Sequence, residues 1–159
     1  MRKLGVIWRA AGVLMAIDSR SIVEVLPPVS CRPAPGAPEW VRGLFAYRGA
    51  LIPLVDAGRL LGATPGPDLM ANRVIVVRVA AGAAPIEWPV GLWVESLLAI
   101  ERIDFEAAGG HPGFATDMGR FLGPVTQTRW GQVQLVEPAG IFTPEQTAVM
   151  TQRLAEAAA

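Results

Sequence analysis

The sequence predicts an all-β fold, built as a sandwich or barrel of short strands. Short apolar runs rich in Val, Ile and Leu recur along the 159 residues, and turn signals separate them. The chain contains 17 Gly and 14 Pro, which favours many turns over a helix bundle. Because 52% of the residues are hydrophobic and 18% are charged, the chain can bury a sizeable core. The length suits one domain with room for two halves.

The first elements expected are two strands, Gly5–Arg9 and Val13–Ile17. The basic start followed by apolar residues is also a pattern of signal peptides. Arg9 interrupts the apolar stretch, however, and no small-residue cleavage pattern follows it, so strands are the favoured interpretation. No run of about 18 apolar residues occurs, so no transmembrane helix and no direct membrane insertion are expected.

The next strand is expected at Ile22–Leu26, where Pro27 and Pro28 end it. The segment 31–38 (CRPAPGAP) contains three prolines, which predicts an extended surface connection rather than regular structure. Further apolar runs predict strands at Leu44–Tyr47, Leu51–Val55, Val74–Val79, Val90–Val94, Leu97–Ile100 and Val133–Val136.

Short helical turns are predicted at two places. Pro38 is expected to begin a turn through PEWVRG that ends before Gly43, since proline favours the first helical position. In DAGRLLG, Asp56 is the expected N-cap and Gly62 the stop. The segment 62–68 is the most linker-like, and loops are expected at 80–85 and 106–113.

A C-terminal helix is expected over residues 143–159. Thr143 is the predicted N-cap, Pro144 occupies the first helical position, and Gln146 stands where a capping box requires it. Val149, Met150 and Leu154 are spaced to form one apolar face.

The residue types needed for catalysis or metal binding are sparse. His111 is the only histidine and Cys31 the only cysteine, so neither a zinc site nor an internal disulfide is expected. Glycine-rich nucleotide loops and the G-x-S-x-G motif are absent. The net charge is zero, with no basic run, so nucleic acid is a poor candidate partner. We expect no metal and no cofactor, and no spacing argues for the paired carboxylates of a hydrolase, although none excludes them.

Two charged residues stand in apolar surroundings. Glu24 lies inside the run SIVEVL, and Arg48 precedes Gly49, which predicts a tight turn between strands. A charge beside a buried strand usually has an opposite partner, so Arg48 is expected to pair with Glu24. On placement alone, two solvated side chains explain the pattern equally well.

The segment 21–62 resembles the CheW family of chemotaxis coupling proteins. The match consists of a V-x-E-V-like strand, a proline-rich loop, a P-x-W-V-x-G turn and an R-G-x-x-x-P-x-x-D run. Its residues here are Ile22, Glu24, Val25, Pro38, Trp40, Val41, Gly43, Arg48, Gly49, Pro53 and Asp56. Weaker similarity, with Gly91 and Glu95 at matching places, extends it to about residues 5–145. AYRG together with FLGPV is similar to coupling proteins of alternative arrays, such as Wsp-type surface-sensing systems.

The resemblance implies two SH3-like five-stranded β-barrel subdomains packed together, with short helices and the C-terminal helix. It places one CheW-like domain at 1–145, with approximate subdomains 5–62 and 63–142, and the helix at 143–159. It implies a cytoplasmic, non-enzymatic adaptor associated with membrane-bound receptor arrays. The implied partners are the regulatory domain of a CheA-type histidine kinase and the cytoplasmic tip of chemoreceptors. The implied partner-binding or groove-shaping residues are Ile22, Val23, Glu24, Gly43, Leu44, Arg48, Gly49, Gly91 and Glu95.

Two other functional classes remain open on the sequence. One is a small-ligand-binding or catalytic β-barrel, for which the sequence offers no recognisable site. The other is the excised regulatory domain of a larger kinase, which an initial Met and a capped final helix disfavour. Of the five tryptophans, most are expected in the core and one or two at an interface.

Overall fold

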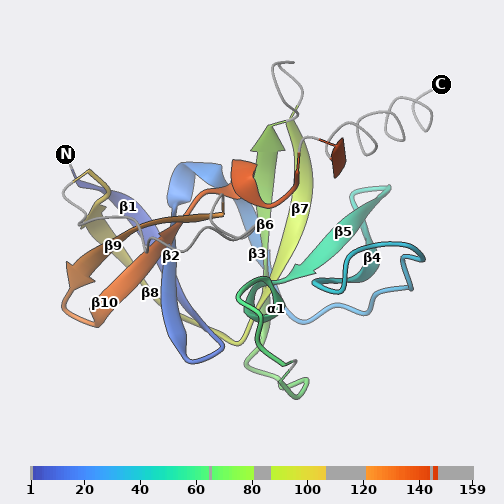
Figure 1. Cartoon of the computed structure of the whole chain (residues 1–159), viewed down its shortest axis with the longest axis horizontal. Helices are drawn as coiled ribbons and strands as arrows, with labels where there is room; N and C mark the ends of the chain where they lie inside the picture. The colour runs from blue at the N-terminus through green and yellow to red at the C-terminus, as the bar shows by residue number, and fades with distance from the viewer. Residues whose placement is uncertain (1, 65, 81–86, 107–120, 144, 147–159) are drawn as a thin grey trace.

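The computed structural model consists of two five-stranded sheets (Figure 1), as the all-β prediction required. It describes residues 2–64, 66–80, 87–106, 121–143 and 145–146. The central sheet has the order β3-β6-β7-β5-β4, and the terminal sheet has the order β8-β1-β2-β10-β9. The strands of the central sheet are β3 (Ile22–Leu26), β4 (Val41–Tyr47), β5 (Ala50–Asp56), β6 (Arg73–Ala80) and β7 (Glu87–Val94). Those of the terminal sheet are β1 (Arg2–Ala10), β2 (Val13–Asp18), β8 (Ser96–Asp104), β9 (Leu122–Thr128) and β10 (Gly131–Val136).

The two sheets repeat one topology. Each contains a single parallel pair, β5 with β7 and β10 with β2, and the other pairs are antiparallel. When its strands are numbered along the chain, the central sheet has the order 1-4-5-3-2. The terminal sheet has the same order if β1 and β2 are counted after β10. The N-terminal hairpin therefore completes the sheet that β8, β9 and β10 form.

This arrangement differs from the expected subdomains 5–62 and 63–142. β1 and β2 precede residue 62 but pair with strands that follow residue 95, while β6 and β7 belong with β3, β4 and β5. The segment 62–68 joins two elements of the central unit, the helix α1 (Ala57–Leu60) and β6. A linker-like composition marks a surface connection here, not the boundary between the sheets.

Both faces of each sheet carry apolar side chains, as closed or strongly curved sheets require. Along β6, Val74 and Val76 pack with Phe45 and Trp93 inside the central sheet. The alternate residues Ile75, Val77 and Val79 join the core between the sheets. The terminal sheet has its own interior cluster of Ile7, Ala16, Ile103, Val133 and Leu135. The molecule is thus two curved sheets with separate interiors and one shared core.

The expected helical turn through PEWVRG is shorter than predicted. The amide of Val41 donates to the carbonyl of Pro38 at 3.0 Å, which closes one turn, and β4 begins at Val41. Gly43 accordingly lies within a strand, at a shift of register against β5, rather than past the end of a helix. The helix α1 forms as expected, and the Asp56 carboxylate accepts from the amides of Gly58 and Arg59.

Pro53 lies on an interior strand of the central sheet, since β5 stands between β7 and β4. The partner of Pro53 in the register is Leu44, which directs its amide and carbonyl to Arg32 on the other side. On the β4 side, Leu44 therefore needs no hydrogen bond from the Pro53 nitrogen. On the β7 side, the pairing of β5 begins only at Leu54.

The start of the C-terminal helix has the predicted cap. The amide of Gln146 donates to Thr143 Oγ1 at 3.1 Å, and the amide of Thr143 donates to Gln146 Oε1 at 2.9 Å. The rest of the expected helix, residues 81–85 of one predicted loop and residues 107–113 of the other, which include His111, lie outside the described residues. None of the helices described has the length and apolar character needed to cross a bilayer.

Candidate functional site

Arg48 and Gly49 form the two central residues of the β4–β5 turn. Both have positive φ, 48° and 82°, between the paired residues Tyr47 and Ala50. This is the geometry of a type I′ turn, which follows the twist of the flanking strands. Gly49 adopts it without strain, whereas Arg48 is held in a conformation that a side chain disfavours.

The predicted partner of Arg48 is present. Arg48 Nη2 donates to Glu24 Oε2 at 3.1 Å, and the guanidinium carbon lies 5.1 Å from the centre of the Tyr47 ring. Glu24 is on β3 and Arg48 follows β4, and these strands are the opposite edges of the central sheet. The pair therefore joins the two edges where the sheet curls round. Its side chains are 65% and 37% exposed, so it is a surface contact rather than a buried bridge.

The three predicted apolar contact residues do not form one patch. Ile22 packs partly against the shared core, and Val23 packs partly into the interior of the central sheet. Leu44, on the edge strand β4, is half-buried and lines a groove. Only Leu44 of the three therefore contributes to a concave apolar surface.

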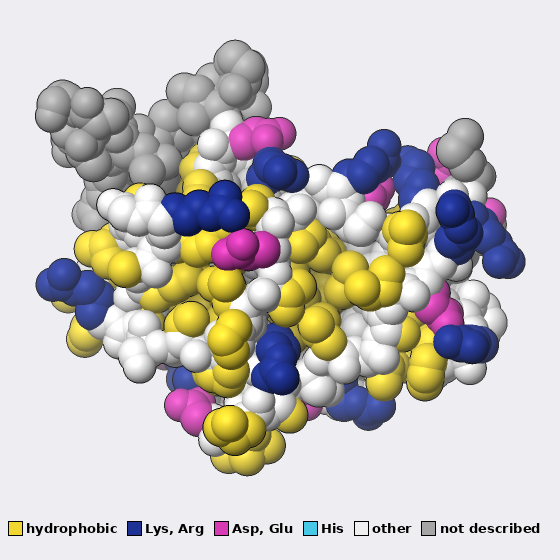
Figure 2. Space-filling view, turned by 180° about the vertical axis from the view of Figure 1, so that it is seen from behind, with side chains coloured by type: hydrophobic (Ala, Val, Ile, Leu, Met, Phe, Trp, Pro, Cys, Tyr) yellow, Lys and Arg dark blue, Asp and Glu magenta, His cyan; other side chains and the backbone are white. Residues whose placement is uncertain are grey.

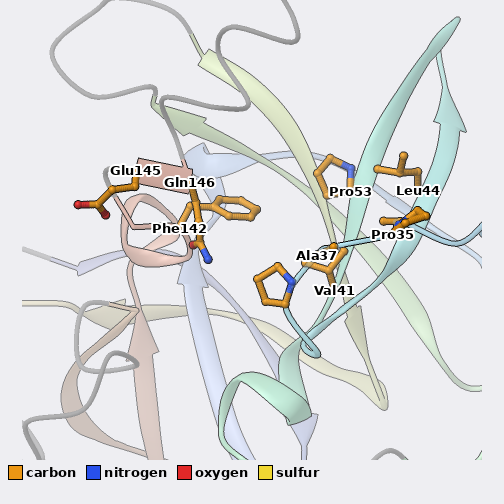
Figure 3. A pocket seen from close by; sticks show the side chains of 11 residues that line it. Pro35, Ala37, Val41, Leu44, Pro53, Phe142, Glu145 and Gln146 are labelled. Atoms are coloured by element: carbon orange, nitrogen blue, oxygen red, sulfur yellow. The ribbon is translucent and has the colours of Figure 1, made fainter.

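That groove has a volume of ≈ 440 Å³ and is almost entirely apolar (Figure 3). The proline-rich loop, β4 and β5 line one side, and the start of the C-terminal helix lines the other. The residues that contribute are Ala34, Pro35, Gly36, Ala37, Pro38, Val41, Leu44, Pro53, Phe142, Glu145 and Gln146. Glu145 is the only charged residue among them. A groove of this kind suits an apolar helix or loop of another protein.

An aromatic cluster holds the two sides of the groove in place. The Phe142 ring lies 5.4 Å from Trp40 and 5.0 Å from Trp88, measured between ring centres. Phe142 follows β10 of the terminal sheet, while Trp40 and Trp88 belong to the central unit. The groove is thus built from segments of both units, and its shape depends on their packing. Phe142 and the loop prolines were not among the predicted site residues, because no local sequence signal marks a surface that distant segments assemble.

The predicted glycines Gly43 and Gly91 shape the fold rather than present a contact. A Cβ on Gly91 would lie 2.7 Å from the Phe45 ring and 2.9 Å from a methyl of Val74. A Cβ on Gly43 would collide with the carbonyl oxygen of Arg32, which bridges to β4 at Leu44. Each glycine therefore allows a neighbour to approach closely.

Glu95 lies where the two units meet, away from Arg48. Its carboxylate accepts from the amide of Ala11 at 2.8 Å, and its own amide donates to the carbonyl of Arg9 at 3.0 Å. Ala11 has a positive φ of 54° in the β1–β2 turn. Glu95 therefore fixes that turn against the end of β7.

Arg42 contacts two carboxylates and an aromatic ring, and none of these residues was among the predicted site residues. Arg42 donates to Asp56 at 3.2 Å and to Asp68 at 2.8 Å, and it lies 4.2 Å from the Trp93 ring centre. This network stabilises the junction between α1, the segment 62–68 and the central sheet.

Nothing in the described part of the chain groups three His, Cys, Asp or Glu side chains as a metal site would. Cys31 is exposed, and its thiol lies 3.5 Å from the carbonyl of Arg42. Hydrophobic side chains instead gather across the middle of the face in Figure 2, with charged side chains around them. Such a surface is typical of contacts with other proteins.

Comparisons with known proteins agree with this architecture. A family model described as CheW-like domain matches residues 4–146. The chemotaxis protein CheW of Rhizobium meliloti (strain 1021) is 25% identical over 140 residues, which cover 87% of this chain and 86% of that protein. The crystal structure of the scaffolding protein TtCheW from Thermoanaerobacter tengcongensis superposes with a TM-score of 0.74 at 23% identity. That match covers 86% of this chain and 90% of the other. With the family model spanning nearly all of its length, the chain belongs to the CheW-like domain family.

Proposed function

We propose that this chain is a non-enzymatic adaptor that couples chemoreceptors to a CheA-type histidine kinase. Its place in the CheW-like family makes it a protein of chemotaxis-type signalling, and the related structure is that of a scaffolding protein. Its partners are the cytoplasmic tip of a chemoreceptor and the regulatory domain of the kinase. It works in the cytoplasm, at arrays of membrane-bound receptors.

The apolar groove is the observation that carries this proposal. A receptor tip is a helical hairpin, and a helix places its apolar face into a groove of this composition. Leu44, Pro53 and Phe142 supply apolar area on both sides. Transmission of the signal from receptor to kinase then depends on how rigidly the groove holds the receptor. The Trp40–Phe142–Trp88 cluster supplies that rigidity.

The Glu24–Arg48 pair has a supporting part in the proposal. It joins β3 to the β4–β5 turn and so maintains the curvature of the sheet that presents Leu44. Because both side chains are substantially exposed, they are also available to polar groups of a partner at the rim of an interface.

The test is the affinity of a labelled receptor-tip hairpin for the purified protein and its Leu44→Glu variant, measured by fluorescence anisotropy. A carboxylate in the apolar groove should weaken binding at least about tenfold. Leu51→Glu is the matched control, because Leu51 is an exposed leucine on the adjoining strand that does not line the groove. Equal affinity of both variants would overturn the assignment of the groove to the receptor.

A further inference from the structure

A second hollow lies in the terminal sheet, away from the groove. It has a volume of ≈ 330 Å³ and lies between β8 and β9, the two edge strands of that sheet. In Figure 1, β8 and β9 lie on the left of the molecule, whereas β4 and β5, which line the groove, lie on the right. No residue lines both the hollow and the groove. The hollow is therefore a separate site, of a size that small ligands occupy.

Two arginines of the hollow share one face of the β1–β8 ladder. Arg2 lies opposite Asp104, and Arg102 lies opposite Leu4. Because alternate residues of a strand point to the same face, Arg2 and Arg102 are diagonal neighbours, about 7–8 Å apart. Both are exposed, and neither guanidinium forms an ion pair with a residue that the structure describes. Two like charges thus stand side by side at the hollow.

The two carboxylates that line the hollow have other partners. Glu101 pairs with Arg129, and this contact joins β8 to the turn that follows β9. Asp104 Oδ1 accepts from the amide of Glu106 at 3.0 Å. Neither carboxylate forms an ion pair with the two arginines of the β1–β8 ladder, so an anion that enters the hollow meets two available guanidinium groups.

A nearly buried hydroxyl group lines the hollow from its other edge. Thr126, on β9, is only 8% exposed, and its hydroxyl forms no hydrogen bond within the described part of the chain. Its partner in the register is Val133, which belongs to the interior of the terminal sheet. Buried hydroxyl groups normally have a hydrogen-bond partner. Thr126 therefore offers a free donor to a ligand in the hollow.

We propose that the hollow between β8 and β9 binds the phosphate group of a small phosphomonoester. Such a group carries about −1.5 to −2 charges near neutral pH, which matches two arginines better than the single charge of a carboxylate does. A guanidinium binds two phosphate oxygens at once, and the Thr126 hydroxyl donates to a further one. The remaining volume of the hollow accommodates the organic part of the ligand. The bound ligand joins β1 and β8 to β9.

The experiment is an NMR titration of the isotope-labelled full chain at constant ionic strength, with AMP, adenosine and inorganic phosphate as probes. AMP should cause saturable shifts of amide signals, and these should be largest around Thr126 and Arg102. Adenosine should cause no such shifts, and an excess of inorganic phosphate should displace AMP. The comparison separates recognition of the phosphate group from stacking of the base on an exposed aromatic ring.

Variants assign the binding to the named side chains. Arg2→Gln and Arg102→Gln should each weaken AMP binding about tenfold. Thr126→Val keeps the shape of the side chain but removes the hydroxyl, so it should weaken binding about three- to tenfold. Arg9→Gln is the matched control, because Arg9 is an exposed arginine on the same strand as Arg2 and does not line the hollow. It changes the net charge by the same amount and should bind AMP like the unmodified protein.

Three results would each overturn the proposal. They are the absence of saturable shifts up to about 10 mM AMP, equal binding of AMP and adenosine, and an equal loss of affinity in Arg9→Gln and Arg102→Gln. The last result would show that only the net charge attracts the nucleotide. The amide spectrum of each variant reports at the same time whether it is folded. The titration involves neither receptor nor kinase, so failure here leaves the adaptor proposal standing.

Discussion

Arg48 Nη2 lies 3.1 Å from Glu24 Oε2, and this contact joins the two edge strands of one curved sheet. The terminal sheet repeats the arrangement. There Arg129, in the β9–β10 turn, pairs with Glu101 on β8, and these strands are again opposite edges. In both turns the arginine lies over a neighbouring aromatic ring, Tyr47 at 5.1 Å and Trp130 at 5.0 Å. An arginine at a hairpin turn thus links the edges of each unit.

The first prediction concerns the coupling of Glu24 and Arg48. In a double-mutant cycle with Arg48→Glu and Glu24→Arg, the charge-reversed double variant should recover part of the stability that each single variant loses. Because the side chains are exposed, the coupling should be small, about 0.2–1 kcal/mol. Urea unfolding at low salt measures it. Strictly additive effects would show that the contact contributes nothing to stability.

A larger loss of stability is expected at Asp56. Its carboxylate accepts from the amides of Gly58 at 3.0 Å and Arg59 at 3.1 Å, and from Arg42 at 3.2 Å. Asp56→Ala should lower the free energy of unfolding by roughly 2–4 kcal/mol, since it removes both a helix cap and a mostly buried charge partner. Asp56→Asn keeps the cap and should cost clearly less. Chemical denaturation compares them, and equal losses would mean that the cap contributes little.

Gly91 should tolerate no side chain. Gly91→Ala places a methyl within 3 Å of Phe45 and Val74 in the interior of the central sheet. We expect a loss of about 1–3 kcal/mol from overpacking, measured as a lower midpoint of thermal unfolding. Gly66→Ala is the control, because no atom lies within 4 Å of a Cβ at that glycine. A midpoint for Gly91→Ala equal to that of the control would contradict the close packing described.

The Tyr47 hydroxyl gives stability a dependence on alkaline pH. Burial raises the pKa of Tyr47 above its ordinary value of 10.0, and the charge of Arg48 only partly opposes this effect. A raised pKa means that the folded state holds the proton more tightly, so the contribution is present below pH 10 and is lost as the pH rises above it. Tyr47→Phe should reduce the fall in stability between roughly pH 9 and 11.

At neutral pH the same variant should be nearly neutral or slightly stabilising. The hydroxyl is buried without a well-formed hydrogen bond to a residue that the structure describes, and burial and the nearby Glu24 carboxylate both raise its pKa, so its removal loses little. Unfolding curves at several pH values test both statements. An unchanged pH profile for Tyr47→Phe would show that other groups control the alkaline loss.

Local patterns in the sequence predicted most of the elements. The strands around Val13–Ile17 and Val74–Val79, the Asp56 cap, the turn at Gly49 and the Thr143–Gln146 cap all have signals within a few residues, and all are confirmed. The Glu24–Arg48 contact was one of two equally supported interpretations of two charges in apolar runs, and the structure shows the pair, although both side chains are exposed.

Features that depend on distant segments were not predicted. The pairing of β2 with β10 joins residues about 120 positions apart along the chain, and no local pattern specifies such a parallel contact. The groove likewise needs Pro53 and Phe142 to meet after folding. The role of Glu95 as an acceptor for the Ala11 amide depends on a turn 84 residues away. Apolar patterning states that a residue is buried, but not against which strand.

The most direct test of the adaptor function asks whether this protein links the two proposed partners. The regulatory domain of a CheA-type kinase is immobilised, and retention of a receptor-tip hairpin is measured with and without the protein. The account predicts that the hairpin is retained only when the protein is present, and that Leu44→Glu reduces retention of the hairpin while still binding the kinase domain. If the protein binds neither partner at tens of micromolar, or if one partner displaces the other, the coupling function is contradicted.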